Sequence, residues 1–112
     1  METTRPILTG RTAFAGEATG RVKIIVTSAD RDQVEVGDIL VTAMTDPDMV
    51  PAMERAAAII TDRGGVTCHA ANVSRELKKP CIVGTRVASE VLKKYNNIRV
   101  TATRKSGDVF AN

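Results

Sequence analysis

Residues 59–84 constrain the fold more than any other stretch of this chain, because they read as strand, turn, helix and strand in succession. Residues 57–61 are a short apolar run with β-branched side chains, which is typical of a buried strand. The pair Gly64-Gly65 ends that strand, since glycine adopts backbone angles that other residues resist. Residues 67–79 contain no proline or glycine and Pro80 follows them, so this span predicts a helix.

The only histidine of the chain, His69, falls in the first turn of that predicted helix. The first backbone N–H groups of a helix lack partners, and the helix dipole favours negative charge there. A neutral imidazole is a nucleophile near pH 7, so it can accept a phosphoryl group directly. His69 is therefore a candidate phosphoryl acceptor. The backbone of Gly64 and Gly65, the hydroxyl of Thr67 and the positive charge of Arg63 are expected to bind the phosphoryl oxygens.

Purely structural interpretations also fit the same residues. A lone histidine is more often a surface or structural residue, and glycines before a helix are common as plain turns. A catalytic pair of Cys68 and His69 is disfavoured, because adjacent residues lie about 100° apart around a helix and their side chains diverge. The residues alone leave the role of His69 open.

The residues around His69 form a longer motif, which favours the phosphoryl-acceptor interpretation of the histidine. The string GGVTCHAANVSREL, followed by PCIVG, closely resembles the phosphohistidine motif of the phosphoenolpyruvate-utilising enzymes, and the resemblance extends upstream through GDILVTAMTDPDMVPAMERAAAIITDRGG. It implies a mobile, swivelling β/β/α domain. Cys68 is most like the phosphoenolpyruvate synthases, whereas pyruvate phosphate dikinase and enzyme I of the sugar phosphotransferase system usually have serine there and remain alternatives. A non-catalytic swivel-like binding module is the alternative of another class.

By this resemblance, Nε2 of His69 carries a phosphoryl group between an ATP-grasp domain and a phosphoenolpyruvate/pyruvate barrel. Those partner domains, in the same chain or in another, are expected to hold Mg²⁺, and this domain is expected to bind no cofactor or metal. Thr45 and Asp46 are expected near the histidine, and simple helix capping is the other interpretation of both. Glu76 is expected on the same helix face. Thr67 matches a threonine that a regulatory kinase modifies in some relatives.

Length and composition set the remaining expectations. The 112 residues, 43% of them hydrophobic, predict one α/β domain over residues 1–112, with a mixed sheet and short helices. There is no apolar run long enough for a membrane span and no signal-peptide core, so we expect a cytoplasmic protein. A phosphate-binding Walker loop is absent, and one histidine cannot make a conventional zinc site. Aromatic residues amount to 3%, which argues against nucleic-acid binding.

The charge is divided unevenly along the chain. Residues 1–56 hold six Lys+Arg and nine Asp+Glu, a balance of −3, whereas residues 57–112 hold ten and four, a balance of +6. The basic half contains His69, which suits an anionic cargo.

Further local patterns predict the other elements. Strands are expected at 22–26, 39–41, 81–83, 98–103 and 109–110. A helix is expected after Asp46-Pro47, displaced toward residues 50–56 or split into two turns by Pro51. Another is expected over residues 87–95, with Val87, Val91 and Leu92 facing inward. Arg75 is expected to form a surface pair with Glu76, and both cysteines, Cys68 and Cys81, are expected as reduced thiols.

Overall fold

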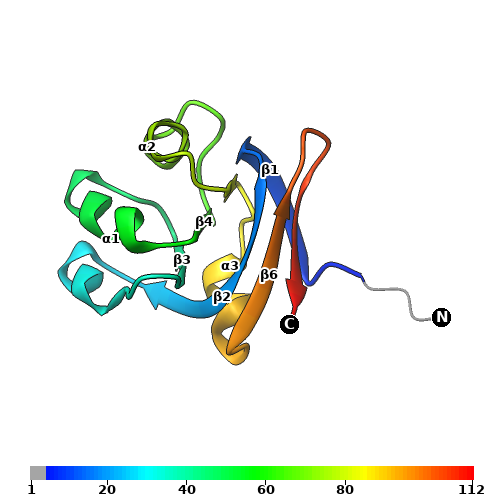
Figure 1. Cartoon of the computed structure of the whole chain (residues 1–112), viewed down its shortest axis with the longest axis horizontal. Coiled ribbons are helices and arrows are strands. Elements are labelled where there is room, and N and C mark those ends of the chain that lie inside the picture. The colour runs from blue at the N-terminus through cyan, green and yellow to red at the C-terminus, as the bar shows by residue number, and fades with distance from the viewer. Residues whose placement is uncertain (1–4) are drawn as a thin grey trace.

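A computed structural model describes residues 5–112 of the chain as a layered assembly of strands and short helices (Figure 1). The strands are β1 (Leu8–Phe14), β2 (Gly16–Ile25), β3 (Ile39–Thr42), β4 (Ala58–Thr61), β5 (Cys81–Val83), β6 (Asn97–Ala102) and β7 (Gly107–Ala111). The α-helices are α1 (Val50–Arg55), α2 (His69–Leu77) and α3 (Ala88–Val91), and the 3-10 turns are η1 (Ser28–Gln33), η2 (Pro47–Met49) and η3 (Leu92–Lys94).

The strands close into a barrel in the order β1-β5-β4-β3-β2-β6-β7. Strands β2 to β5 pair in parallel, whereas β1, β6 and β7 join their neighbours antiparallel. Strands β1 and β2 connect the two groups, since β1 pairs with β5 and β7 and β2 pairs with β3 and β6. The barrel thus has a parallel side, β2 to β5, and an antiparallel side formed by β6 and β7 with their neighbours, and α1 and α2 lie on the outer side of β3 and β4 (Figure 1).

Alternating side chains of the parallel strands build two separate cores. Leu40 and Ile59 pack with the buried residues of α1 and α2, such as Met53 and Ala71. The neighbouring residues Ile39, Val41, Ala58 and Ile60 pack instead with the antiparallel sheet, α3 and η3. Both faces of β3 and β4 are therefore buried, as parallel strands require, and this explains why their sequences are apolar without alternation.

The predicted α/β class with a layered mixed sheet and short helices is confirmed. The expected strands at 39–41 and 81–83 correspond to β3 and β5, and the helix expected over residues 50–56 corresponds to α1 after the short turn η2. Pro51 lies in the first turn of α1, where its missing N–H costs no hydrogen bond. Within residues 5–112, no helix is long and apolar enough to cross a membrane.

Two local expectations are wrong. The helix expected over residues 67–79 is shorter at both ends: Cys68 is extended, with φ −74° and ψ 171°, and Lys78 is left-handed, with φ 58° and ψ 46°. Val87, expected to face inward, is 46% exposed. It precedes α3 with non-helical backbone angles, so the helical periodicity does not apply to it.

Candidate functional site

The site lies where the parallel strands β3 and β4 end. The segment after β3 leads to Thr45, and the loop after β4 leads to His69, the first residue of α2. Since β3 and β4 pair in parallel, with Thr42 opposite Thr61, both connections leave the same edge of the sheet. Loops at the carboxyl ends of parallel strands are the usual place for ligand sites in α/β folds.

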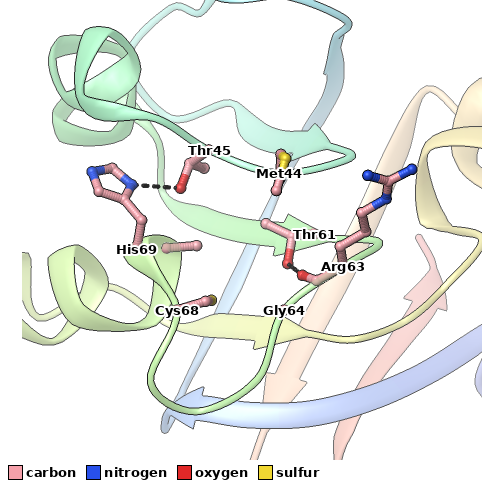
Figure 2. Close-up of a pocket in the computed structure, with 8 residues that line it drawn as sticks. Met44, Thr45, Thr61, Arg63, Gly64, Cys68 and His69 are labelled. Atoms are coloured by element: carbon pink, nitrogen blue, oxygen red, sulfur yellow. Dashed lines mark hydrogen bonds between the residues drawn. The ribbon is translucent and has the colours of Figure 1, made fainter.

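Thr45 and His69 meet at this edge. The Thr45 Oγ1 atom lies 2.8 Å from Nδ1 of His69, within hydrogen-bonding distance. Thr45 is 8% exposed, whereas His69 is half-buried. In Figure 2 the other ring nitrogen, Nε2, points away from Thr45 and from the remaining labelled residues. The contact engages one nitrogen of the imidazole and leaves Nε2 available to a reactant.

A small cavity of about 80 Å³ lies on the Nδ1 side of the ring. Its lining consists of Met44, Thr45, Thr61, Arg63, Gly64, Cys68, His69 and Ala70. Because one water in the liquid occupies about 30 Å³, the cavity can hold a few waters but no nucleotide. A phosphoryl donor must therefore approach Nε2 from outside this cavity.

The two glycines of the loop, Gly64 and Gly65, differ in backbone conformation and in the space around them. Gly64 has φ +103°, and a Cβ atom there would lie 2.7 Å from the Cys68 sulfur. Gly65 is not among the positive-φ glycines, and a Cβ atom would meet nothing within 4 Å. The expectation that both glycines supply unusual angles is correct for Gly64 and wrong for Gly65. A role of either backbone in binding a phosphoryl group stays a prediction.

Thr67 and Arg63 occupy different sides of the site. Thr67 is exposed beside the start of α2, and its carbonyl accepts a hydrogen bond from Asn72 Nδ2 at 3.3 Å. Arg63 is also exposed, and Figure 2 shows its guanidinium extending away from His69. Its backbone is fixed, since the Arg63 N–H donates to the Ala43 carbonyl at 3.0 Å. Contact of either side chain with a phosphoryl group stays a prediction.

Asp46 and Glu76, the other two expected supporting residues, have no contact with the imidazole among the hydrogen bonds of the described residues. Asp46 is the N-cap residue of η2, yet its side chain makes no capping bond, and its Oδ1 is buried without a partner. Glu76 is exposed on α2. Glu76 is seven positions along the helix from His69, a rise of about 10 Å, so it lies beyond direct reach of the ring.

Arg75 has a role that the sequence did not indicate. Its guanidinium donates to the carbonyl oxygens of Val66 and Ala13 and to Oδ1 of Asn72. These bonds tie the loop before His69 to β1 and to α2, so the expected surface pair with Glu76 is wrong. Two of the acceptors are backbone carbonyls, which every residue has, and no sequence signal could have identified them.

The two cysteines are free thiols with different surroundings. Cys68 packs beside Gly64, and in Figure 2 its side chain diverges from that of His69, which argues against a thiol–imidazole pair. Cys81 is fully buried in β5, and this burial raises the pKa of its thiol to about 11. Within residues 5–112 no three side chains of His, Cys, Asp or Glu gather closely enough to hold a metal ion.

Fold and site together define a swivel-type α/β domain with an accessible histidine at the start of a helix. A family profile described as "PEP-utilising enzyme, mobile domain" matches residues 34–105. The chain belongs to this family of phosphoenolpyruvate-utilising enzymes.

Named relatives agree with this assignment. The chain is 57% identical over 98 residues to a probable phosphoenolpyruvate synthase of Methanothermobacter thermautotrophicus, covering 88% of this chain and 14% of the relative. It is 54% identical over 104 residues to the phosphoenolpyruvate synthase of Pyrococcus furiosus, covering 93% of this chain and 13% of the relative. The chain thus spans only a small part of the length of these relatives.

Among solved structures, an NMR structure of an enzyme I protein superposes with a TM-score of 0.57. The sequence identity is 24%, and the match covers 74% of this chain and 34% of that one. At this identity the likeness shows the fold alone.

Proposed function

We propose that this chain is a phosphoryl-carrier domain of a phosphoenolpyruvate synthase-like enzyme, transiently phosphorylated on Nε2 of His69. The observation that carries the proposal is the contact between Thr45 Oγ1 and Nδ1, because it leaves Nε2 free at the start of α2. The names of the relatives favour a synthase over pyruvate phosphate dikinase or enzyme I.

The transfer follows from the protonation of the ring. When Nδ1 carries the proton and donates to Thr45 Oγ1, the lone pair remains on Nε2. That lone pair attacks the phosphorus of the donor, an N–P bond forms, and the P–O bond to the leaving group breaks with its electrons on oxygen. In the second half-reaction an acceptor oxygen attacks the same phosphorus and the electrons of the N–P bond return to Nε2. The N–H groups at the start of α2 favour the negative charge nearby.

Donor activation belongs to other domains. A phosphoryl transition state spreads charge over several oxygens and is normally stabilised by Mg²⁺ and clamping cations. We assign the ATP site to an ATP-grasp domain and the phosphoenolpyruvate/pyruvate site to a barrel domain, which would hold the Mg²⁺. The shares of 13% and 14% leave ample length for such domains in the relatives. The isolated chain is therefore expected to fold but to turn over none of these substrates.

A chimera tests the proposal. The segment of the Pyrococcus furiosus enzyme that matches this chain is replaced by this chain, and phosphoenolpyruvate formation from pyruvate and ATP is measured. We expect turnover, together with an acid-labile, alkali-stable phosphoryl label on the grafted segment. His69→Ala should abolish both, while circular dichroism confirms that the variant is folded. Turnover or the same label in the His69→Ala chimera would falsify the proposal.

A further inference from the structure

A second hollow, of about 600 Å³, adjoins the histidine cavity and shares Arg63 and Gly64 with it. Its other lining residues are Arg11, Ala43, Asp62, Gly84 and Arg86. Arg11 comes from β1, Arg63 from the loop after β4, and Arg86 from the loop after β5. Three arginines distant in sequence thus surround one hollow that adjoins the histidine cavity.

Their charges are not balanced within the described part of the chain. Asp62 is the only carboxylate of the lining, and its two oxygens accept hydrogen bonds from the N–H and the hydroxyl of Ser89. Among residues 5–112 the one side-chain ion pair is Lys93–Glu90, which lies outside this hollow. Asp62 offsets one of the three positive charges, so the lining keeps a net charge of +2, which attracts an anionic surface.

The backbone at the hollow is held in an uncommon conformation. Arg86 has φ +75°, one of two positive values among the non-glycine residues described. Its N–H donates to the Asp62 carbonyl at 2.8 Å, which fixes it against the loop that bears Arg63. Residues kept in this region of backbone angles cluster at functional sites.

The composition of the face fits a protein partner better than a small anion. Arg11, Arg63 and Arg86 are all exposed, whereas sites for small ligands enclose most of the ligand surface. Exposed apolar side chains lie next to them: Val87 follows Arg86 and is 46% exposed, and Met44 in the histidine cavity is 54% exposed. Arginine combined with apolar side chains is typical of interfaces between proteins.

Arg63 also points away from the reacting atom. Figure 2 shows its guanidinium and Nε2 of His69 extending in opposite directions. We propose that Arg11, Arg63 and Arg86 form a docking surface for an acidic patch on the domain that exchanges a phosphoryl group with His69. This inference rests on the proposed carrier function. The matched relatives are several times longer than this chain, so they have room for such a partner domain.

Charge reversal in the chimera tests the docking surface. Arg11→Glu combined with Arg86→Glu removes two of the three positive charges and leaves Arg63 intact. Arg21→Glu combined with Arg104→Glu is the matched control, since both residues are exposed and line neither the hollow nor the histidine cavity. We expect kcat to fall about tenfold or more in the first variant and less than about twofold in the control. Labelling of His69 by phosphoramidate should be equal in both, which shows that each is folded and reactive.

The dependence of kcat on salt gives a second measurement. Raising the ionic strength from about 50 to about 300 mM should lower kcat of the unmodified chimera, and should lower it less in the Arg11→Glu/Arg86→Glu variant. Equal kcat in the two variants, or no effect of salt, overturns the docking surface. So does tight binding of inorganic phosphate or pyrophosphate to the free chain that the Arg11→Glu/Arg86→Glu change abolishes, because the hollow would then be a small-anion site. If His69→Ala abolishes turnover but the Arg11→Glu/Arg86→Glu change does not lower kcat, the carrier function holds and the docking surface is wrong.

Discussion

Thr45 Oγ1 lies 2.8 Å from Nδ1 of His69, although 24 positions separate the two residues. The hydroxyl follows β3 and the imidazole follows β4, so the parallel pairing of these strands brings them together. The buried hydroxyl holds the ring in one orientation. It thereby determines that Nε2 faces outward. A phosphoryl acceptor requires such an exposed ring nitrogen.

Replacing Thr45 should therefore change the chemistry of the ring more than the fold. Thr45→Val keeps the shape and removes the hydroxyl, and we expect His69 phosphorylation in the chimera to slow by about 10- to 100-fold. Thr45→Ser keeps a hydroxyl and should stay within about threefold of the unmodified rate. The ¹⁵N chemical shifts of the imidazole should show a mixture of tautomers only in Thr45→Val. Equal rates in the two variants would mean that the hydroxyl does not orient the ring.

Gly64 should not tolerate a side chain. Gly64→Ala imposes φ +103° on an alanine and sets its Cβ 2.7 Å from the Cys68 sulfur, so the free energy of unfolding should fall by about 2 kcal/mol. Gly65→Ala is the matched control, and a change below about 0.5 kcal/mol is expected because its Cβ enters open space. Urea denaturation measures both. Adding Cys68→Ala to Gly64→Ala should restore part of the loss; no recovery would assign all of it to the backbone angle.

Local signals in the sequence predicted the frame of the site. Glycine, proline and apolar periodicity identified the strand before Gly64, the helix that begins near His69 and the strand that follows Pro80. These are properties of neighbouring residues, and burial of both faces of β4 enforces the same pattern. The C-terminal end of α2 was missed because Lys78 adopts a left-handed conformation that its residue type does not predict, and the N-terminal end was missed because Cys68 is extended.

Contacts between distant segments could not be predicted in the same way. The geometry between Thr45 and His69 depends on the register of β3 against β4, and the family resemblance indicated only that the two residues lie near each other. The sequence contains no signal for the carbonyl partners of Arg75 or for the placement of Arg11 and Arg86 around one hollow. The pair Gly64-Gly65 shows a further limit, since two identical residues side by side have different backbone angles.

Arg75 should stabilise the loop before His69. Arg75→Met keeps a good helix former and an apolar stem but loses the bonds to Ala13 and Val66, so the free energy of unfolding should fall by about 1–2 kcal/mol. Amide exchange at Cys68, whose N–H donates to the Gly65 carbonyl, should become faster. Arg104→Met, at an exposed arginine of the turn before β7, is the control. Unchanged exchange at Cys68 in Arg75→Met would contradict this role.

The Cys81 thiol should make stability fall at alkaline pH. Burial raises its pKa from 9.0 to about 11, so between these values the folded chain binds more protons than the unfolded chain. The contribution is therefore fully present below about pH 9 and is lost as the pH rises toward 11, by on the order of 3 kcal/mol. Lysine and tyrosine side chains titrate in the same range, so the informative quantity is the difference between the unmodified chain and Cys81→Ala. The free energy of unfolding, measured in urea at several pH values, should decline less steeply in Cys81→Ala.

Cys68→Ser is the second comparison, because it keeps the Cys81 thiol and should follow the unmodified chain. Parallel pH profiles for the unmodified chain and Cys81→Ala would show that the buried thiol does not titrate as its surroundings require.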